Sequence, residues 1–214
     1  MKHTIALIVY FLFFLGAPLF TDAQDFSILK VGTQEWMGKN LDTDKFSNGE
    51  SIPEAKTKQQ WTEAGLSGKA AWCYFNNDPS SNEKHGKLYN WHVVSDPRGI
   101  CPQGWRVPND EDWNKLTESL GGLEEAGLKL ISNRRWNNGV LPQDLSKIPG
   151  LSGGYRCDIG NFYDNNESGY WWTLSELSKA DSWDRSLDIK KTSIKRTSGN
   201  KGNGESIRCI RSAE

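Results

Sequence analysis

Apolar and polar positions alternate over short distances along most of this chain, and the pattern predicts a mixture of short strands and helices. Between Phe26 and Leu41, apolar residues recur on both sides of Gly32-Thr33, which predicts two short strands joined by a turn. The next predicted elements are a short helix over Glu54–Ala64, a buried strand over Ala70–Phe75 and a loop over Asn76–Glu83.

The densest local signals fall in the run Cys101–Trp113, which reads Cys-Pro-Gln-Gly-Trp-Arg-Val-Pro-Asn-Asp-Glu-Asp-Trp. Its first proline and glycine predict a turn, and the alternating apolar residues after them predict a short extended piece. Asn109 or Asp110 can cap a helix, and the acidic residues that follow suit the positive end of a helix dipole. Apolar residues then recur at helical spacing until Gly121-Gly122. The run therefore predicts a turn, a strand and a helix in succession.

The second half of the chain predicts a sheet. Leu123–Ile131 is predicted to be a second short helix, and 132–154 an irregular, polar stretch of the kind often used for binding. Thr197–Gly204 has the composition of a hairpin loop. The predicted strands are Tyr155–Cys157, Tyr170–Leu174, Trp183–Ile189 and Ser206–Ile210. The predicted fold class is α+β, with helices early and a late antiparallel sheet whose final strand returns near the N-terminus.

The first residues predict export. Ile5–Leu15 is almost continuously apolar, and Thr21-Asp-Ala23 supplies the small residues that a signal peptidase prefers. The apolar run is shorter than the roughly 20 residues that a membrane span needs, although a retained anchor helix is the alternative. The prediction is a signal peptide over residues 1–23, one secreted domain over residues 24–214 and no membrane insertion after cleavage.

The composition limits the classes of partner and indicates what the core is made of. The formal net charge is −1, so no broad electrostatic field favours nucleic acid or an anionic membrane. Ten Trp in a chain of mean hydropathy −0.67 predict an aromatic core beneath many loops. Four Cys in an exported chain favour two disulfides, and spacing alone leaves all three pairings open.

The run Cys101–Trp113, written Cys-Pro-x-Gly-Trp-x-x-Pro-x-x-x-x-Trp, resembles the signature of the Fibrobacter succinogenes major paralogous domain, found in secreted and surface proteins of bacteria. The resemblance extends in order over nearly all of residues 24–214. The other stretches that resemble motifs of this family are Val31–Leu41, Trp72–Asp78, Gly86–Trp91, Gly153–Arg156, Gly169–Thr173 and Ser206–Ile210.

This resemblance implies a fold similar to the C-type lectin-like fold, loop-rich and stapled by disulfides. It also implies that Cys101 pairs with Cys209, which leaves Cys73 with Cys157. The formylglycine-generating enzymes that share this fold act through two cysteines near the C-terminal end of the domain. This chain has only Cys209 there, so their activity is not carried over.

No catalytic residue is predicted. Gly150-Leu-Ser-Gly-Gly154 matches the G-x-S-x-G pattern, but that serine elbow needs a later histidine, and none follows His92. The chain also lacks the spacings typical of zinc sites. Hydrolysis by a pair of carboxylates is neither predicted nor excluded, because the two residues of such a pair come together in the folded structure and need not be close in the sequence.

One segment gathers hard oxygen atoms that suit calcium. Asp164-Asn-Asn-Glu-Ser-Gly169 imitates the start of an EF-hand loop, but Ser175 stands where the bidentate Glu belongs, so an EF-hand is rejected. A solvated turn is the simpler interpretation, and no other cofactor is predicted. The candidate ligands of a looser calcium site are Asp158, Asn161, Asp164, Asn166 and Glu167.

Aromatic rings mixed with amides and carboxylates suit carbohydrate binding, since rings stack on sugar faces. The candidate ligand-binding residues are Trp136, Trp171, Trp172 and Trp183, against the simpler interpretation that most tryptophans form the core. The leading hypothesis is a secreted, non-catalytic module that binds a glycan or a protein at the bacterial surface. The alternatives are a secreted hydrolase or modifying enzyme, and a purely structural envelope protein.

Overall fold

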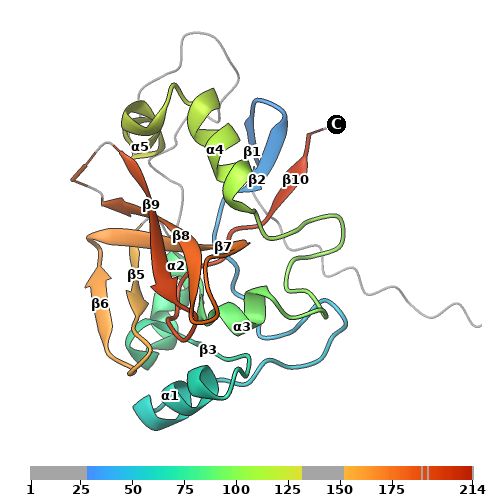
Figure 1. Ribbon diagram of the computed structural model, residues 1–214, viewed down its shortest axis with the longest axis vertical. Helices are drawn as coiled ribbons and strands as arrows, with labels where there is room; N and C mark the ends of the chain where they lie inside the picture. The colour runs from blue at the N-terminus through green and yellow to red at the C-terminus, as the bar shows by residue number, and fades with distance from the viewer. Residues whose placement is uncertain (1–27, 132–151, 189, 192, 214) are drawn as a thin grey trace, which may run out of the picture.

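Three small sheets and several short helices make up the protein in the computed structural model (Figure 1). The structure describes residues 28–131, 152–188, 190–191 and 193–213. This mixture of helices and small sheets confirms the predicted fold class at that level. The predicted signal peptide, residues 1–23, lies outside the described residues.

The first sheet joins the two ends of the described chain. Strands β1 (Ile28–Val31) and β2 (Gln34–Met37) form the predicted hairpin around Gly32, which has φ +58°. Strand β10 (Ile210–Ser212) pairs antiparallel with β2, as the predicted return of the final strand requires. The predicted strand Ser206–Ile210 is largely wrong, because only Ile210 of it belongs to β10.

A closing segment, defined as Gly204–Ile210, runs between the sheets and forms backbone hydrogen bonds with each region it passes. Glu205 exchanges two such bonds with Tyr89, at 2.9 and 3.0 Å. Ser206 bonds to the backbone of Tyr170 and Trp172. The partners of the other residues are Arg156 for Gly204, Leu41 for Ile207, Met37 for Cys209 and Arg106 for Ile210. The closing segment therefore links all three sheets and the approach to α4.

Helix α4 (Asp110–Ser119) begins as the sequence predicts, with Asn109 as its N-cap. The Asn109 side chain accepts a bond from the Asp112 N–H at 2.9 Å, and Asp112 accepts one from the Asn109 N–H at 2.8 Å. Arg106 donates two bonds to the same carboxylate, at 2.5 and 2.8 Å. These reciprocal bonds satisfy N–H groups that a helix start leaves unpaired. Helix α5 (Leu123–Ile131) follows over the predicted range.

Replacing this cap gives a direct measure of its contribution. We expect Asn109→Ala to lower the free energy of unfolding by about 1 kcal/mol, because the Asp112 N–H loses its partner. Urea unfolding followed by tryptophan fluorescence measures the change. Glu118→Ala, on an exposed position of the last turn, is the control and should change little. An equal effect of both variants would contradict a specific capping role.

The five-stranded sheet has the strand order β6-β5-β7-β8-β9. The sequence predicted β5, β7 and β8 approximately and missed two strands. Strand β6 is short and rich in polar residues, and β9 is a polar edge strand that occupies part of the predicted hairpin loop Thr197–Gly204. Edge strands are often polar, which hides them from a search for apolar alternation. The strands are β5 (Gly153–Arg156), β6 (Phe162–Asn165), β7 (Ser168–Glu176), β8 (Asp181–Asp188) and β9 (Ile194–Asn200).

Residues 58–94 form a series of short elements. Helix α1 (Lys58–Leu66) begins later than predicted, because Thr57 forms a capping box with Gln60. The predicted strand Ala70–Phe75 is reduced to β3 (Trp72–Cys73), and Asn76–Glu83 contains helical turns instead of being all loop. The remaining elements are η1 (Phe75–Asn77), η2 (Pro79–Ser81), α2 (Asn82–His85), β4 (Leu88–Tyr89) and α3 (Trp91–Val94).

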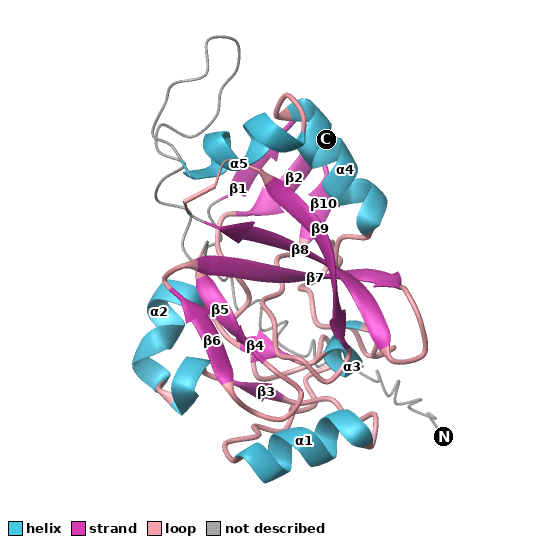
Figure 2. Ribbon diagram, turned by 60° about the vertical axis from the view of Figure 1, so that its left-hand side comes forward, coloured by secondary structure: helices cyan, strands magenta, loops and turns pink. Residues whose placement is uncertain are grey.

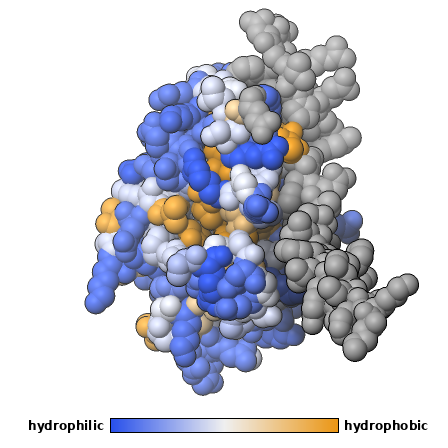
Figure 3. All heavy atoms as spheres, turned by 90° about the vertical axis from the view of Figure 1, so that its right-hand side faces the viewer, coloured by the Kyte–Doolittle hydropathy of each residue, from blue (hydrophilic) through white to orange (hydrophobic). Residues whose placement is uncertain are grey.

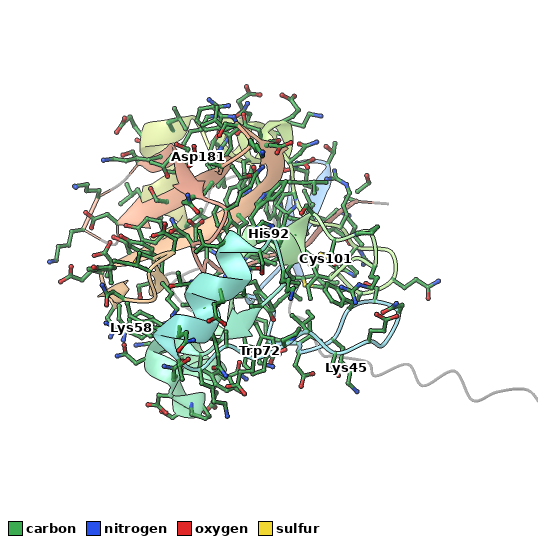
Figure 4. The ribbon with its side chains drawn as sticks, turned by 60° about the horizontal axis from the view of Figure 1, so that its bottom comes forward. Lys45, Lys58, Trp72, His92, Cys101 and Asp181 are labelled. Atoms are coloured by element: carbon green, nitrogen blue, oxygen red, sulfur yellow. A yellow bond between two sulfur atoms is a disulfide. The ribbon has the colours of Figure 1, made fainter. Side chains whose placement is uncertain are left out.

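The core is aromatic, as the tryptophan content predicts. The Trp113 ring lies between those of Trp36 and Trp171, with centroids 4.8 and 6.0 Å away. Trp61 and Trp72 belong to other buried clusters. Figure 4 shows Trp72 behind α1, with Lys58 at one end of that helix and His92 near its other end. Tryptophans thus fill the spaces between the small sheets.

One of the two predicted disulfides is present. Cys101 and Cys209 are bonded, with an S–S distance of 2.01 Å, so the pairing implied by the resemblance is confirmed (Figure 4). The second predicted pair is wrong, because Cys73 and Cys157 are free thiols. Arg156 is fully buried and its side chain bonds the Cys73 thiol, so the guanidinium occupies the space beside that sulfur.

Candidate functional site

The structure separates the tryptophans that the sequence proposed as a ligand site. Trp171 and Trp172 are 3 % and 0 % exposed, so the prediction that they contact a ligand is wrong. Their indole N–H groups donate to the Asn40 side chain and the Tyr89 carbonyl. Both residues lie in the consecutively buried part of β7, residues 171–173. Trp136 lies outside the described residues.

Trp183 is half-buried, and one face of its ring is covered. The guanidinium of Arg196 lies 3.3 Å from the centroid of the ring, a distance typical of a cation–π contact. Arg196 is itself bonded to Asp110, at 2.9 Å. Trp183 therefore takes part in a surface ion network and does not offer this ring face to a ligand.

The side-chain oxygen atoms proposed as calcium ligands do not lie together in one site. Asp158 and Asn161 lie at one end of β6, whereas Asp164, Asn166 and Glu167 lie at the other end. Lysines hold two of these groups: Lys58 donates to Asn161 and Lys84 to Asn166, at 2.5 and 2.6 Å. In the part of the chain that the structure describes, no three His, Cys, Asp or Glu residues are grouped to hold a metal ion.

Three tyrosines from neighbouring strands form a surface that the sequence analysis missed. Tyr155 of β5 is paired with Tyr163 of β6, and their rings stack with centroids 5.4 Å apart. The Tyr155 ring also lies 4.9 Å from that of Tyr170 on β7. Tyr163 is 43 % exposed, and the other two rings are half-buried. We call Tyr155, Tyr163, Tyr170 and Asp164 the tyrosine surface.

A carboxylate fixes one side of the tyrosine surface. Asp164 has φ +61°, in the left-handed region that Asp tolerates better than most residues, and it accepts a 2.6 Å bond from the Tyr170 hydroxyl. Burial and this bond raise the pKa of Tyr170 well above its usual value. Burial and the charge of Asp164 also raise the pKa of Tyr155. Both phenols are therefore neutral at physiological pH and keep their hydroxyl protons.

The hairpin β5–β6 supplies the signal that could have revealed this surface. Asp158-Ile-Gly160 is a turn sequence, and Gly160 has φ +85°. A hairpin centred there places Tyr155 opposite Tyr163. Tyr170 joins the surface only because β7 pairs with β5. The contact between Tyr170 and Tyr155 therefore cannot be predicted from neighbouring residues in the sequence.

Two carboxylates near the tyrosine surface are buried. Asp184 and Glu205 are each 2 % exposed. Thr197 donates to Asp184, whereas the Glu205 Oε2 atom has no partner among the residues the structure describes. Burial raises the pKa of Asp184 to about 6, and burial with the charge of Asp184 raises the pKa of Glu205 well above its usual value. Each side chain therefore keeps its proton to a higher pH than an exposed carboxyl group does.

The face shown in Figure 3 is mostly hydrophilic, with apolar side chains in small patches near its middle. Within residues 28–131 and the later described ranges, no helix is long and apolar enough to cross a membrane. The tyrosine surface is a group of three partly exposed aromatic rings in mutual contact on the five-stranded sheet.

A family model described as the Fibrobacter succinogenes major domain matches residues 29–211, so the chain belongs to this family. The match confirms the resemblance drawn from the Cys101–Trp113 run and its companion motifs. Neither a curated protein nor a solved structure matches the chain.

Proposed function

We propose that the protein is a secreted, non-catalytic binding module of C-type lectin-like fold that recognises a glycan at the bacterial surface. The observation that carries the proposal is the tyrosine surface, with Tyr163 at 43 % exposure. The lectin-like fold is supported by β10, which returns to β2, and by the Cys101–Cys209 disulfide that ties the strand-to-helix joint to the final strands.

Aromatic rings and fixed polar groups are the two features that sugar binding requires. A ring covers the C–H groups on one face of a sugar, while carboxylates and amides bond its hydroxyls. On the tyrosine surface, the rings stand beside the Asp164 carboxylate and the Asn161 amide, whose N–H group lies 3.4 Å from the Tyr163 hydroxyl oxygen. Because Tyr155 and Tyr170 already pack on each other, the surface loses little side-chain freedom on binding.

The groups that an enzyme would use support a non-catalytic role. Asp184 and Glu205, the carboxylates with raised pKa, are each 2 % exposed. Cys73 is a free thiol, but burial raises its pKa to about 12, whereas a nucleophilic cysteine needs a lowered pKa. The buried surroundings of these three side chains are typical of structural residues and not of catalytic ones.

A glycan-array screen of the purified protein tests the proposal. We expect selective binding to one group of glycans, and we expect Tyr163→Ala to weaken it at least about tenfold, equivalent to about 1.4 kcal/mol. The physical reason is the loss of the most exposed ring of the surface.

Ile159→Ala provides the matched control. Ile159 is 60 % exposed in the same hairpin, so its replacement also removes apolar area but leaves the rings in place. We expect it to bind as the unchanged protein does. A blank array, recognition of surface proteins alone, or full binding by Tyr163→Ala would contradict the proposal.

A further inference from the structure

Strand β9 ends the five-stranded sheet and directs one row of backbone groups away from it. Figure 2 shows β9 beside β8, on the opposite side of the sheet from β5 and β6. The Lys201 N–H donates to the Ala180 carbonyl at 2.8 Å, one residue beyond the pair Asp181–Asn200. Bonded and non-bonded pairs alternate along an antiparallel ladder. The residues of β9 whose backbone groups face away from β8 are therefore Ile194, Arg196, Ser198 and Asn200.

This outer edge is regular and open. The register between β8 and β9 runs without interruption over seven residue pairs, and β9 contains no proline. Arg196, Ser198 and Asn200 are exposed. The Asn200 carbonyl accepts a 2.7 Å bond from the Asn203 N–H, and no other outward backbone group of β9 has a hydrogen-bond partner among the residues that the structure describes. An edge of this kind can pair with a further strand.

Two cationic side chains of β9 limit which strand can pair with it. Lysine and arginine commonly protect an edge strand from association, and β9 carries Lys195 and Arg196. Arg196 is turned back over its own sheet, because its guanidinium lies 3.3 Å from the centroid of the Trp183 ring and bonds Asp110 at 2.9 Å. Lys195 is exposed and is not held in this way. An incoming strand must therefore leave room for the Lys195 side chain.

We propose that β9 pairs antiparallel with β9 of a second copy of this chain, with Thr197 of both copies at the two-fold axis. This register uses all seven residues of the strand. It sets Lys195 opposite Gly199 of the other copy and Arg196 opposite Ser198, so each cation faces a small residue. Centring the pair on Lys195 or Arg196 would set two like charges directly opposite each other, which destabilises a sheet. Centring it on Ser198 or Gly199 would pair fewer residues of the strand.

The contact is expected to be weak and to stop at two copies. A seven-residue strand edge is about 23 Å long, and pairing it buries less area than the roughly 1,200–2,000 Å² of a standard stable interface. We therefore expect a dissociation constant on the order of 10–100 µM. Because the two-fold axis uses the same edge of both copies, the pair closes on itself and leaves no β9 edge for a third copy. The pairing does not depend on the proposed function.

Sedimentation velocity of the purified protein provides the first test. We expect a monomer at about 1 µM and a growing fraction of dimer up to about 200 µM. A single monomeric species over the whole range overturns the proposal, and so does steady growth beyond the dimer, because a two-fold pair is closed.

Matched variants at one position test whether the backbone edge forms the contact. The Ser198 N–H faces away from β8, so Ser198→Pro removes a donor from the outer edge and leaves the pairing with β8 in place. We expect it to weaken the dimer at least about tenfold, whereas Ser198→Ala, which keeps the N–H, retains the affinity. Thermal melting verifies that both variants fold. An undiminished dimer in Ser198→Pro overturns the proposal.

Cross-linking tests the register. The two copies of Thr197 form a non-bonded pair in the proposed dimer, with Cα atoms about 4.5 Å apart, which a disulfide can join. We expect Thr197→Cys to give a disulfide-linked dimer on a non-reducing gel. Ser198→Cys is the control, because its two copies are offset along the strands and lie beyond the roughly 7 Å that a disulfide can span. Both are compared with the unchanged protein, which has a half-exposed thiol at Cys157. A sedimenting dimer that Thr197→Cys fails to cross-link forms through another surface and overturns the proposal.

Discussion

Replacing both Cys101 and Cys209 with alanine is expected to lower the free energy of unfolding by about 5 kcal/mol. The bond joins residues 108 positions apart, and the chain-entropy model gives about that value for so long a loop. In a domain of this size, the loss corresponds to a fall in Tm of roughly 10–20 °C. Thermal and urea unfolding of the oxidised protein and of the double variant measure the difference.

The two free cysteines make the control informative. Because Cys73 and Cys157 are unpaired, a reductant should destabilise the unchanged protein and have no effect on the double variant. A double variant that still loses stability on reduction would show a bond between Cys73 and Cys157 in solution. Such a result would restore the second predicted disulfide.

The second large effect concerns pH. Below the unfolded value of 3.8, Asp184 is protonated in both the folded and the unfolded chain. Between that value and the folded pKa of about 6, only the folded protein holds the proton. The stability that protonated Asp184 contributes is therefore present in acid and lost as pH rises through about 6, with a total of about 3 kcal/mol. Glu205 acts in the same direction.

We therefore expect the free energy of unfolding to fall as pH rises from about 5 to about 8, by about 1 kcal/mol from Asp184 alone and further from Glu205. Asp184→Asn keeps an oxygen for Thr197 and removes the charge, so it should reduce this dependence to the part that Glu205 contributes and stabilise the protein at the higher pH. Urea midpoints at each pH provide the measurement. Exposed Glu167→Gln is the control, and a slope in Asp184→Asn as steep as in the unchanged protein would disprove the assignment to Asp184.

The sequence analysis predicted correctly those helices and turns that are determined by residues close together in the sequence. The cap Asn109, the turn at Gly32 and helix Leu123–Ile131 follow from residues within a few positions of each other. Strand β9 could not be found in this way, because its polar residues form a strand only when paired with β8. The late start of α1 has a different, local cause: the reciprocal bonds of Thr57 and Gln60, three residues apart, fix the helix start, and composition alone had favoured an earlier one.

The candidate site was harder to predict than the fold. Tryptophan content indicated an aromatic protein correctly but could not separate core rings from surface rings, and Trp171 and Trp172 proved to be core. The tyrosine surface depends on three strands meeting. This arrangement leaves no trace in local sequence, since it arises from contacts between distant segments.

The closing segment also constrains when the protein can fold. Residues 204–210 supply backbone partners to Met37, Leu41, Tyr89, Arg106, Arg156, Tyr170 and Trp172, so each sheet lacks contacts until these residues have been synthesised. Contacts between such distant residues slow folding, because the chain must close large loops first. A nascent chain that has not reached residue 210 therefore remains unable to complete its native structure.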